Sequence, residues 1–294
     1  MLPGQDTDLH EGTDVGSVLS QAILRIAQTL ALDNSVSRLE ARVLASHAWQ
    51  RAPSWLIAHG TDPLTARQLA QFHAMLERRL RGEPIAYITG TREFFGRTFH
   101  VSPAVLIPRP DTELLVERVL AQLPADQAAD ILELGTGSGC IAISLALALP
   151  RSRLTAVDRD RAALSVATSN AHELGARIEY LESDWYSALA TRKYDYIVSN
   201  PPYVPKDDPH LHRGDVRFEP RHALAAGPLG LDALAHIIER APLYLKPQGG
   251  LFLEHGYNQA DDTAALMKKN RFIGVTSWQD LSGISRVTAG FLSE

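Results

Sequence analysis

The chain has 294 residues, of which 45% are hydrophobic and 21% are charged, and its formal net charge is −5 at pH 7. This length favours two domains, and the composition is that of a globular protein, which excludes a disordered or low-complexity chain. The acidic balance argues against nonspecific binding to nucleic acid, which usually requires a basic surplus.

Three features of the sequence bear on the compartment. The longest nearly apolar stretch, residues 141–149, is far shorter than the ~18–20 residues needed to span a bilayer, so we expect no membrane segment. The first residues are acidic and contain no early Lys or Arg, which argues against a signal peptide. Cys140 is the only cysteine, so no intrachain disulfide or cysteine-based zinc site can form, and we expect a cytoplasmic protein.

The first part of the chain predicts a small helical bundle. Residues 1–16 are polar and acidic, and we expect them to form a flexible segment. From there on, apolar residues recur at spacings of three and four, which indicates amphipathic helices, with Leu39 among the residues expected to face inward. Asp62-Pro63 signals the start of a further helix that Gly82 ends. We therefore expect a bundle over 17–83 and interpret it as a partner-binding domain.

Residues 84–110 are predicted to form a connector built on a β-hairpin. Short runs rich in aromatic and β-branched residues are typical of strands, and they occur at 87–89, 93–95, 98–101 and 105–107. The stiff Pro108-Arg109-Pro110 follows, and Asp111 or Thr112 is expected to open a helix.

Beyond residue 110, strands alternate with helices. Strands are predicted at 131–134, 153–157, 178–181, 194–198, 250–254, 272–278 and 286–291. Helices are predicted between them at 139–149, 161–174, 231–240 and 259–269. This alternation predicts an α/β domain over 111–294, with a mostly parallel, seven-stranded sheet covered on both faces. Ligands of such sheets lie beyond the carboxyl ends of the strands, so the loops at those ends are the informative ones.

The loop after the first of these strands is rich in glycine. It reads Gly135-Thr136-Gly137-Ser138-Gly139, and such a turn lets the backbone approach a ligand closely. A dinucleotide fingerprint would require glycine at position 140, where this chain has Cys140. Asp158 ends the next strand, where a carboxylate can accept both hydroxyls of a ribose. The two loops together predict a ligand-binding site.

The third loop contains Asp184-Trp185 after a predicted strand. A carboxylate can accept a hydrogen bond from an exocyclic amine, and an aromatic ring can pack on a purine. An adenine slot is one interpretation, and an exposed turn is the other.

The fourth loop, Asn200-Pro201-Pro202-Tyr203, follows an apolar strand and is the most specific motif. Consecutive prolines fix the backbone and donate no hydrogen bonds, so nearby carbonyls are held available, and Asn200 adds a side-chain carbonyl. Two converging carbonyls can accept both hydrogens of a planar NH2 group, on which Tyr203 can stack. Acceptors placed in this way stabilise positive charge on the nitrogen as it attacks.

These four loops resemble the class I S-adenosylmethionine-dependent methyltransferases that methylate amino groups, and more narrowly the bacterial peptide chain release factor glutamine methyltransferase family. Further segments that match this family are 82–87, 92–94, 107–113, 183–185, 214–220, 253–256 and 286–288. The resemblance implies a Rossmann-like fold, S-adenosylmethionine as cofactor and S-adenosylhomocysteine as product. It also implies peptide chain release factors as partners, methylated on the glutamine of their Gly-Gly-Gln motif.

The resemblance also implies roles for individual residues. Carried over, the cofactor-binding residues are Gly135, Thr136, Gly137, Ser138, Gly139, Asp158, Trp185 and Asn200, to which the adenine-slot interpretation adds Asp184. Those holding the glutamine amide are Asn200, Pro201, Pro202 and Tyr203, with Asn200, Pro201 and Tyr203 as the catalytic residues. The implied reaction is in-line displacement at a sulfonium methyl by the amide nitrogen, driven by positioning and electrostatics without a strong general base.

Two regions near the motif carry weaker signals. Tyr203 and Phe95 are expected to line the glutamine slot, and segment 204–230, rich in Pro, Gly and charge, is expected to be a lid or docking loop. His210 and His212 lie among aspartates in that segment, but a solvated loop explains them, so we expect no metal site.

Three alternative functions remain at this point. An adenine amino-methyltransferase acting on DNA or RNA would use the same NH2 slot, but the acidic charge and the lack of an evident target-recognition domain disfavour it. We therefore expect no stable nucleic-acid binding. A nicotinamide-dependent oxidoreductase is disfavoured by Cys140, which breaks the fingerprint. A non-enzymatic module that senses the cofactor is compatible with the sequence.

Overall fold

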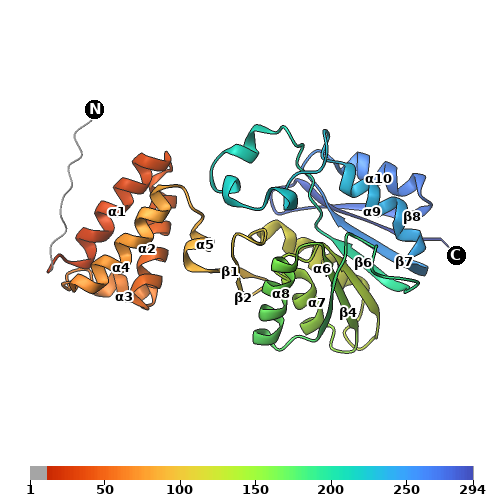
Figure 1. Ribbon diagram of the computed structural model, residues 1–294, viewed down its shortest axis with the longest axis horizontal. Helices are drawn as coiled ribbons and strands as arrows, with labels where there is room; N and C mark the ends of the chain where they lie inside the picture. The colour runs from red at the N-terminus through yellow and green to blue at the C-terminus, as the bar shows by residue number, and fades with distance from the viewer. Residues whose placement is uncertain (1–11, 294) are drawn as a thin grey trace. The chain divides into compact units, whose positions relative to one another are not determined.

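The computed structural model describes residues 12–293 and divides the chain into two compact units, with the boundary between Gly90 and Thr91 (Figure 1). The expected connector is thereby divided, because 84–90 belongs to the first unit and 91–110 to the second. Part of the expected flexible segment, residues 1–11, lies outside the described residues.

The first unit is helical. Its helices are α1 (Val15–Leu30), α2 (Asn34–Trp49), α3 (Pro53–Ala58), α4 (Ala66–Leu80) and α5 (Ile85–Thr89). Helix α1 begins at Val15 because the Asp14 side chain accepts from Ser17 N at 2.9 Å and caps the first turn. Just before it, Gly12 N donates to Leu64 O at 3.2 Å. Residues 12–16 are therefore fixed by the bundle, unlike the flexible segment predicted there.

Three local predictions for this unit were wrong. Leu39 is 63% exposed, because it lies on the side of α2 opposite to the buried Ala41 and Leu44. Helix α4 begins after Thr65, which forms a capping box with Gln68, and not at Asp62-Pro63. Residues 87–89 lie in helix α5 and not in a strand, although Tyr87 and Ile88 have strand propensity. Packing of Ile88 into the helical core outweighs that local preference.

The second unit opens with the hairpin of β1 (Thr91–Phe94) and β2 (Arg97–His100). Phe94 and Phe99 anchor this hairpin in the core of the unit. Residues 105–107 form no strand; they run as a loop that leads to the 3-10 turn η1 (Pro110–Thr112), from which α6 (Glu113–Gln122) continues.

A seven-stranded sheet forms the centre of the second unit, as the sequence predicted. Its strands are β3 (Asp130–Leu134), β4 (Arg153–Asp158), β5 (Ile178–Glu182), β6 (Tyr194–Ser199), β7 (Leu245–Glu254), β8 (Phe272–Gln279) and β9 (Ser285–Leu292). Their spatial order is β5-β4-β3-β6-β7-β9-β8, and only β9 runs against the others. The order reverses between β3 and β6, which is where ligands of doubly wound folds bind.

Helices cover both faces of this sheet. The remaining helices are α7 (Cys140–Ala148), α8 (Arg161–Leu174), α9 (Asp232–Arg240) and α10 (Ala260–Lys269). One core cluster packs α6, α7 and α8 against strand residues such as Ile131 and Phe252, and the other packs α9 and α10 against Leu132 and Leu251. Side chains of neighbouring strand residues thus point to opposite faces of the sheet. The two groups of helices lie on the two sides of the sheet in Figure 1.

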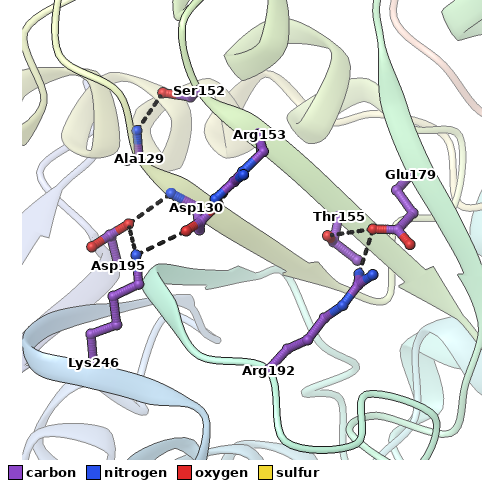
Figure 2. A network of polar contacts seen from close by, with 9 residues as sticks. All are labelled: Ala129, Asp130, Ser152, Arg153, Thr155, Glu179, Arg192, Asp195 and Lys246. Atoms are coloured by element: carbon purple, nitrogen blue, oxygen red, sulfur yellow. Dashed lines mark hydrogen bonds and ion pairs between the residues drawn. The ribbon is translucent and has the colours of Figure 1, made fainter.

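The amino ends of the strands are joined by a network of charges, shown in Figure 2. Lys246 Nζ bridges Asp130 Oδ2 and Asp195 Oδ2 at 2.8 and 2.7 Å, which links the starts of β7, β3 and β6. Arg153 Nε adds β4 by donating to Asp130 Oδ1 at 2.6 Å. Hydrogen bonding from Arg153, supported by Lys246, lowers the pKa of Asp130 to about 2. The amino ends of these four strands are thus tied together electrostatically.

Candidate active site

A cavity of about 440 Å³ opens at the carboxyl ends of β3, β4 and β6. It is lined by most of the predicted site residues, namely Gly135, Thr136, Gly137, Ser138, Asp158, Asp184, Trp185, Asn200 and Pro202. The loops that the sequence singled out therefore converge on one space, as expected where parallel strands end together.

The glycine-rich loop is shaped by backbone conformations that suit glycine. Gly139 has φ +81°, and a Cβ there would lie only 3.0 Å from Ile143 Cδ1 and 3.1 Å from Ala167 Cβ. The buried Asn170 side chain donates to Ser138 O at 2.9 Å and to His100 O at 3.0 Å. The loop is thus held against α8 and the hairpin, with its other face toward the cavity.

Asp158 connects the end of β4 to this loop. Its Oδ2 accepts from Gly137 N at 2.9 Å, and its Oδ1 accepts from Asp160 N at 3.0 Å. Each carboxylate oxygen can accept a second hydrogen bond, so Asp158 retains acceptor capacity toward a ribose in the cavity it lines.

Trp185 lies beside the glycine loop in a conformation that its neighbours maintain. It has φ +51°, and Ser183 Oγ donates to its carbonyl at 2.8 Å. The position of a Cβ on Gly135 would be at van der Waals distance, 3.8 Å, from the Trp185 ring, so the ring lies against the loop, and the φ of +72° at Gly135 is what favours glycine there. Asp184 and Trp185 both line the cavity, as an adenine slot requires.

The Asn200 side chain is oriented by a neighbour far away in sequence. Its Nδ2 donates to Thr112 Oγ1 at 3.1 Å, which places the Oδ1 carbonyl on the other side of the amide. Asn200, Thr112 and Pro202 all line the cavity. An acceptor for an NH2 group is therefore available at this wall.

Four predicted site residues are not part of the cavity wall. Gly139 lies behind the loop, Pro201 is buried, and Phe95 lies in the turn of the hairpin. Tyr203 turns its hydroxyl to Glu254 Oε1 at 3.2 Å, while its carbonyl accepts from Gln259 Nε2 at 3.0 Å. In this structure Tyr203 therefore supports the wall from behind.

Comparisons with known proteins agree with this architecture. The family model "Methyltransferase small domain" matches residues 110–213, and "PrmC N-terminal domain" matches 21–90. A release factor glutamine methyltransferase from Bordetella pertussis is 48% identical over 270 residues, which covers 92% of this chain and 100% of that protein. One from Escherichia coli K12 is 46% identical, covering 86% of this chain and 91% of the relative. The chain belongs to the release factor glutamine methyltransferase family.

A solved structure supports the fold of this family member independently. The Thermus thermophilus 16S rRNA N2 G1207 methyltransferase, solved with AdoMet and guanosine, has a TM-score of 0.53 and 21% identity. The match covers 69% of this chain and 49% of that one, and it shows a shared fold. No helix within residues 12–293 is both long and apolar enough to cross a membrane.

The methyl donor of this methyltransferase family is S-adenosylmethionine, and the residues around the cavity fit it. Asp158 supplies acceptors for ribose hydroxyls, and Trp185 supplies a flat surface for a purine. Glu133, which lines the same cavity, carries a buried oxygen, Oε1, without a hydrogen-bond partner in the described part of the chain. A carboxyl of this kind suits the ammonium group of the cofactor.

Glu133 lines the cavity, and our motif analysis did not assign it a role. Its Oε2 accepts from Thr136 Oγ1 at 2.6 Å and from Ala142 N at 3.1 Å. Complete burial raises the pKa of Glu133 to about 8, although these two hydrogen bonds oppose the rise. The signal was present in the sequence, as a carboxylate inside the apolar strand 131–134.

Several further residues at the cavity were missed because they come from the segments that flank the loops. Arg109 lines the cavity and forms an ion pair with the buried Glu219 of segment 204–230. Glu219 also accepts from Ile107 N at 3.0 Å, so its carboxylate joins that segment to the 101–110 loop. His222 and Ala226 of the same segment complete part of the wall.

Proposed function

We propose that this protein transfers a methyl group from S-adenosylmethionine to the side-chain amide nitrogen of the glutamine in the Gly-Gly-Gln motif of peptide chain release factors. The names of its relatives support this substrate. The observation that carries the proposal is the Asn200 amide, whose Nδ2 is tied to Thr112 and whose Oδ1 is thereby free to accept from a planar NH2 group.

The cofactor would be held by the residues around the glycine loop. Asp158 would bind its ribose, Asp184 and Trp185 its adenine, and Glu133 its ammonium group, while Thr136, Gly137 and Ser138 would enclose it. When bound, S-adenosylmethionine supplies a methyl group on a positively charged sulfur that a nucleophile can displace in line.

The protein's part in the reaction would be to orient the glutamine. Asn200 Oδ1 and a backbone carbonyl of the Pro-Pro corner would accept the two amide hydrogens and draw the nitrogen toward the methyl group. Both acceptors also stabilise the positive charge that grows on this nitrogen, which lowers the barrier without a strong base. The proton then leaves after transfer, once the amide nitrogen has become acidic.

We assign the docking of the release factor in part to the helical unit. Its surface exposes large apolar side chains, among them Leu24 at 56%, Leu39 at 63% and Ile57 at 68%, in helices that otherwise pack inward. These side chains are accessible to a protein partner, whereas the negative net charge disfavours a nucleic acid. With such a substrate, the protein would work in the cytoplasm.

The test is a methyl-transfer assay with purified release factor, radiolabelled S-adenosylmethionine and, in a separate reaction, duplex DNA. We expect label on the release factor and none on DNA. A release factor with alanine in place of the Gly-Gly-Gln glutamine is the matched control, and it should remain unlabelled. Label on DNA but not on the release factor would overturn the proposal in favour of an adenine methyltransferase. Cofactor binding without transfer to either would favour a sensing module.

A further inference from the structure

The segment 204–230 forms a loop whose beginning pairs with its own second half. Val204 N donates to Leu224 O, and Ala226 N donates to Val204 O, both at 2.9 Å. The same second half supplies Ala225 and Ala226 to the cavity wall. The position of this part of the wall therefore depends on how the ends of the segment are held.

The buried side chain of Gln259, at the start of α10, joins the two ends of this segment. Its Nε2 donates to Tyr203 O at 3.0 Å and to Leu229 O at 3.3 Å, and its Oε1 accepts from Gly256 N at 2.8 Å. Two carbonyls on one side and an N–H on the other leave the amide one orientation in which every polar atom meets its complement. The contact is close, because a Cβ on Gly230 would lie 2.2 Å from Tyr203 O.

The Pro-Pro corner of the motif 200–203 needs such support from outside. Its two prolines have no backbone N–H, so the corner depends on hydrogen bonds made by the residues at its ends. On the side of the sheet, Ser199 Oγ donates to Leu134 O at 2.7 Å. At the other end, the Tyr203 carbonyl accepts from Gln259. Because φ is fixed at each proline, a shift of the Tyr203 end would move the carbonyls of the corner with it.

We propose that Gln259 is a positioning residue that holds the Pro-Pro corner and the segment 204–230 in the arrangement that orients the substrate amide. This inference rests on the proposed function, because the place of the corner carbonyls matters to catalysis if one of them accepts from the glutamine NH2. Without the two Nε2 hydrogen bonds, the carbonyls of Tyr203 and Leu229 would turn toward other donors and displace the corner. Asp158 and the glycine loop follow other strands, so cofactor binding should not depend on Gln259.

The experiment compares Gln259→Glu and Gln259→Met with wild type at pH 6 and pH 8.5. A protonated carboxyl can donate to Tyr203 O while it accepts from Gly256 N, whereas an ionised carboxylate only accepts. Burial disfavours the charged form, so we expect the introduced carboxyl to be mostly protonated at pH 6 and ionised at pH 8.5. Methionine keeps the length of the side chain but donates at neither pH.

The comparison with wild type is made at each pH separately. Glu254 contacts Tyr203, His255 contacts Gly256 O, and both are present in wild type as well. The same holds for Asp261 and Asp262 in the first turn of α10. Titration of these groups therefore cancels when each kcat is divided by the wild-type kcat at the same pH.

We expect kcat for release factor methylation to fall roughly 10-fold to 100-fold in Gln259→Met at both pH values. In Gln259→Glu the fall should be as large at pH 8.5 and roughly 3-fold to 10-fold smaller at pH 6, where the hydrogen bond to Tyr203 O is restored. The Kd for S-adenosylmethionine should change little in both variants. The matched control is Gln122→Glu, at the exposed end of α6, which should keep the wild-type kcat at both pH values. A loss in Gln259→Glu that is equal at the two pH values would assign the effect to packing and contradict the proposal.

A second readout is independent of the substrate. Hydrogen exchange of the Val204 and Ala226 backbone amides reports whether the segment 204–230 is held. Compared with wild type at the same pH, exchange should be faster in Gln259→Met at both pH values and in Gln259→Glu at pH 8.5. Unchanged exchange in Gln259→Met would overturn the positioning role, whatever the assay shows. If wild type fails to methylate the release factor, the proposed function fails, and the exchange rates still decide whether Gln259 holds the segment.

Discussion

The backbone N–H of Gly137 donates to Asp158 Oδ2 at 2.9 Å and joins the middle of the glycine loop to the end of the neighbouring strand. The other oxygen of the same carboxylate accepts from Asp160 N at 3.0 Å. One side chain therefore both shapes the loop and lines the cavity, so the conformation of the loop and the proposed binding of a ribose would depend on the same charge.

Replacement of Asp158 by Asn should weaken cofactor binding. The NH2 of the introduced amide would face one of the two backbone N–H donors, those of Gly137 and Asp160. The side chain would also offer one acceptor fewer to the hydroxyls of a ribose. We expect the Kd for S-adenosylmethionine, measured by calorimetry, to rise roughly 10-fold to 100-fold. Glu182→Gln is the control, because Glu182 pairs with Asp158 in the sheet register but lies outside the cavity wall and forms a surface ion pair with Arg161. Equal affinity in Asp158→Asn and wild type would contradict the ribose assignment.

Replacement of Asn200 by Ala should separate binding from turnover. Without the side-chain carbonyl, the glutamine nitrogen loses an acceptor that stabilises its developing charge, so kcat should fall roughly 100-fold to 1,000-fold. The Kd for S-adenosylmethionine should change much less. The kcat is measured by steady-state kinetics and the Kd by calorimetric titration of the same protein. Asn270→Ala, at the end of α10, is a matched truncation that should leave kcat unchanged. A normal kcat in Asn200→Ala would refute the proposed role of Asn200.

Glu133 should make the protein less stable as the pH rises. Its pKa is raised to about 8 in the folded protein from an ordinary value of 4.5. The stability associated with the protonated form is present below pH 4.5 and is lost as the pH rises through 8. Glu133→Gln cannot ionise, so the Tm of this variant relative to wild type should be higher at pH 8.5 than at pH 5. The expected difference is roughly 2–4 °C for each kcal/mol by which ionisation of Glu133 lowers the free energy of unfolding of wild type.

The control for this pH dependence is the exposed Glu239 on α9. Glu239→Gln should show a Tm difference from wild type that stays constant between the two pH values. The same constant difference in Glu133→Gln would mean that the buried carboxyl does not titrate in this range.

Asp130 should make the protein less stable as the pH falls, which is the opposite pH dependence to that of Glu133. Its pKa is lowered to about 2 from 3.8, so its contribution to stability is present above pH 3.8 and is lost as the pH falls through 2. Asp130→Asn should therefore lower Tm at pH 7, and the deficit should shrink on approach to pH 2. Asp207→Asn, in an exposed loop, should have little effect at either pH. A deficit from Asp130→Asn that persists at pH 2 would assign the loss to geometry and not to charge.

The sequence predicted those parts of the site that lie on single loops. Gly137, Asp158 and Trp185 each follow a strand directly, and parallel strands bring such positions together. Thr112 and Arg109 were not assigned, because their proximity to Asn200 and Glu219 depends on contacts between segments about 90 to 110 residues apart. Tertiary packing likewise placed 87–89 in a helix, where local propensity favoured a strand.

Strand β9 runs against its neighbours, and Val287 lies opposite Glu254 while Phe291 lies opposite Gly250. Strand β9 therefore begins at the end of the sheet where the cavity opens. It ends at the opposite end of the sheet, next to the exposed Ser293. A fluorophore or surface tether attached at Ser293 would sit on the side of its unit remote from the cavity mouth. Binding and turnover could then be followed on immobilised molecules without the attachment blocking access to Asn200.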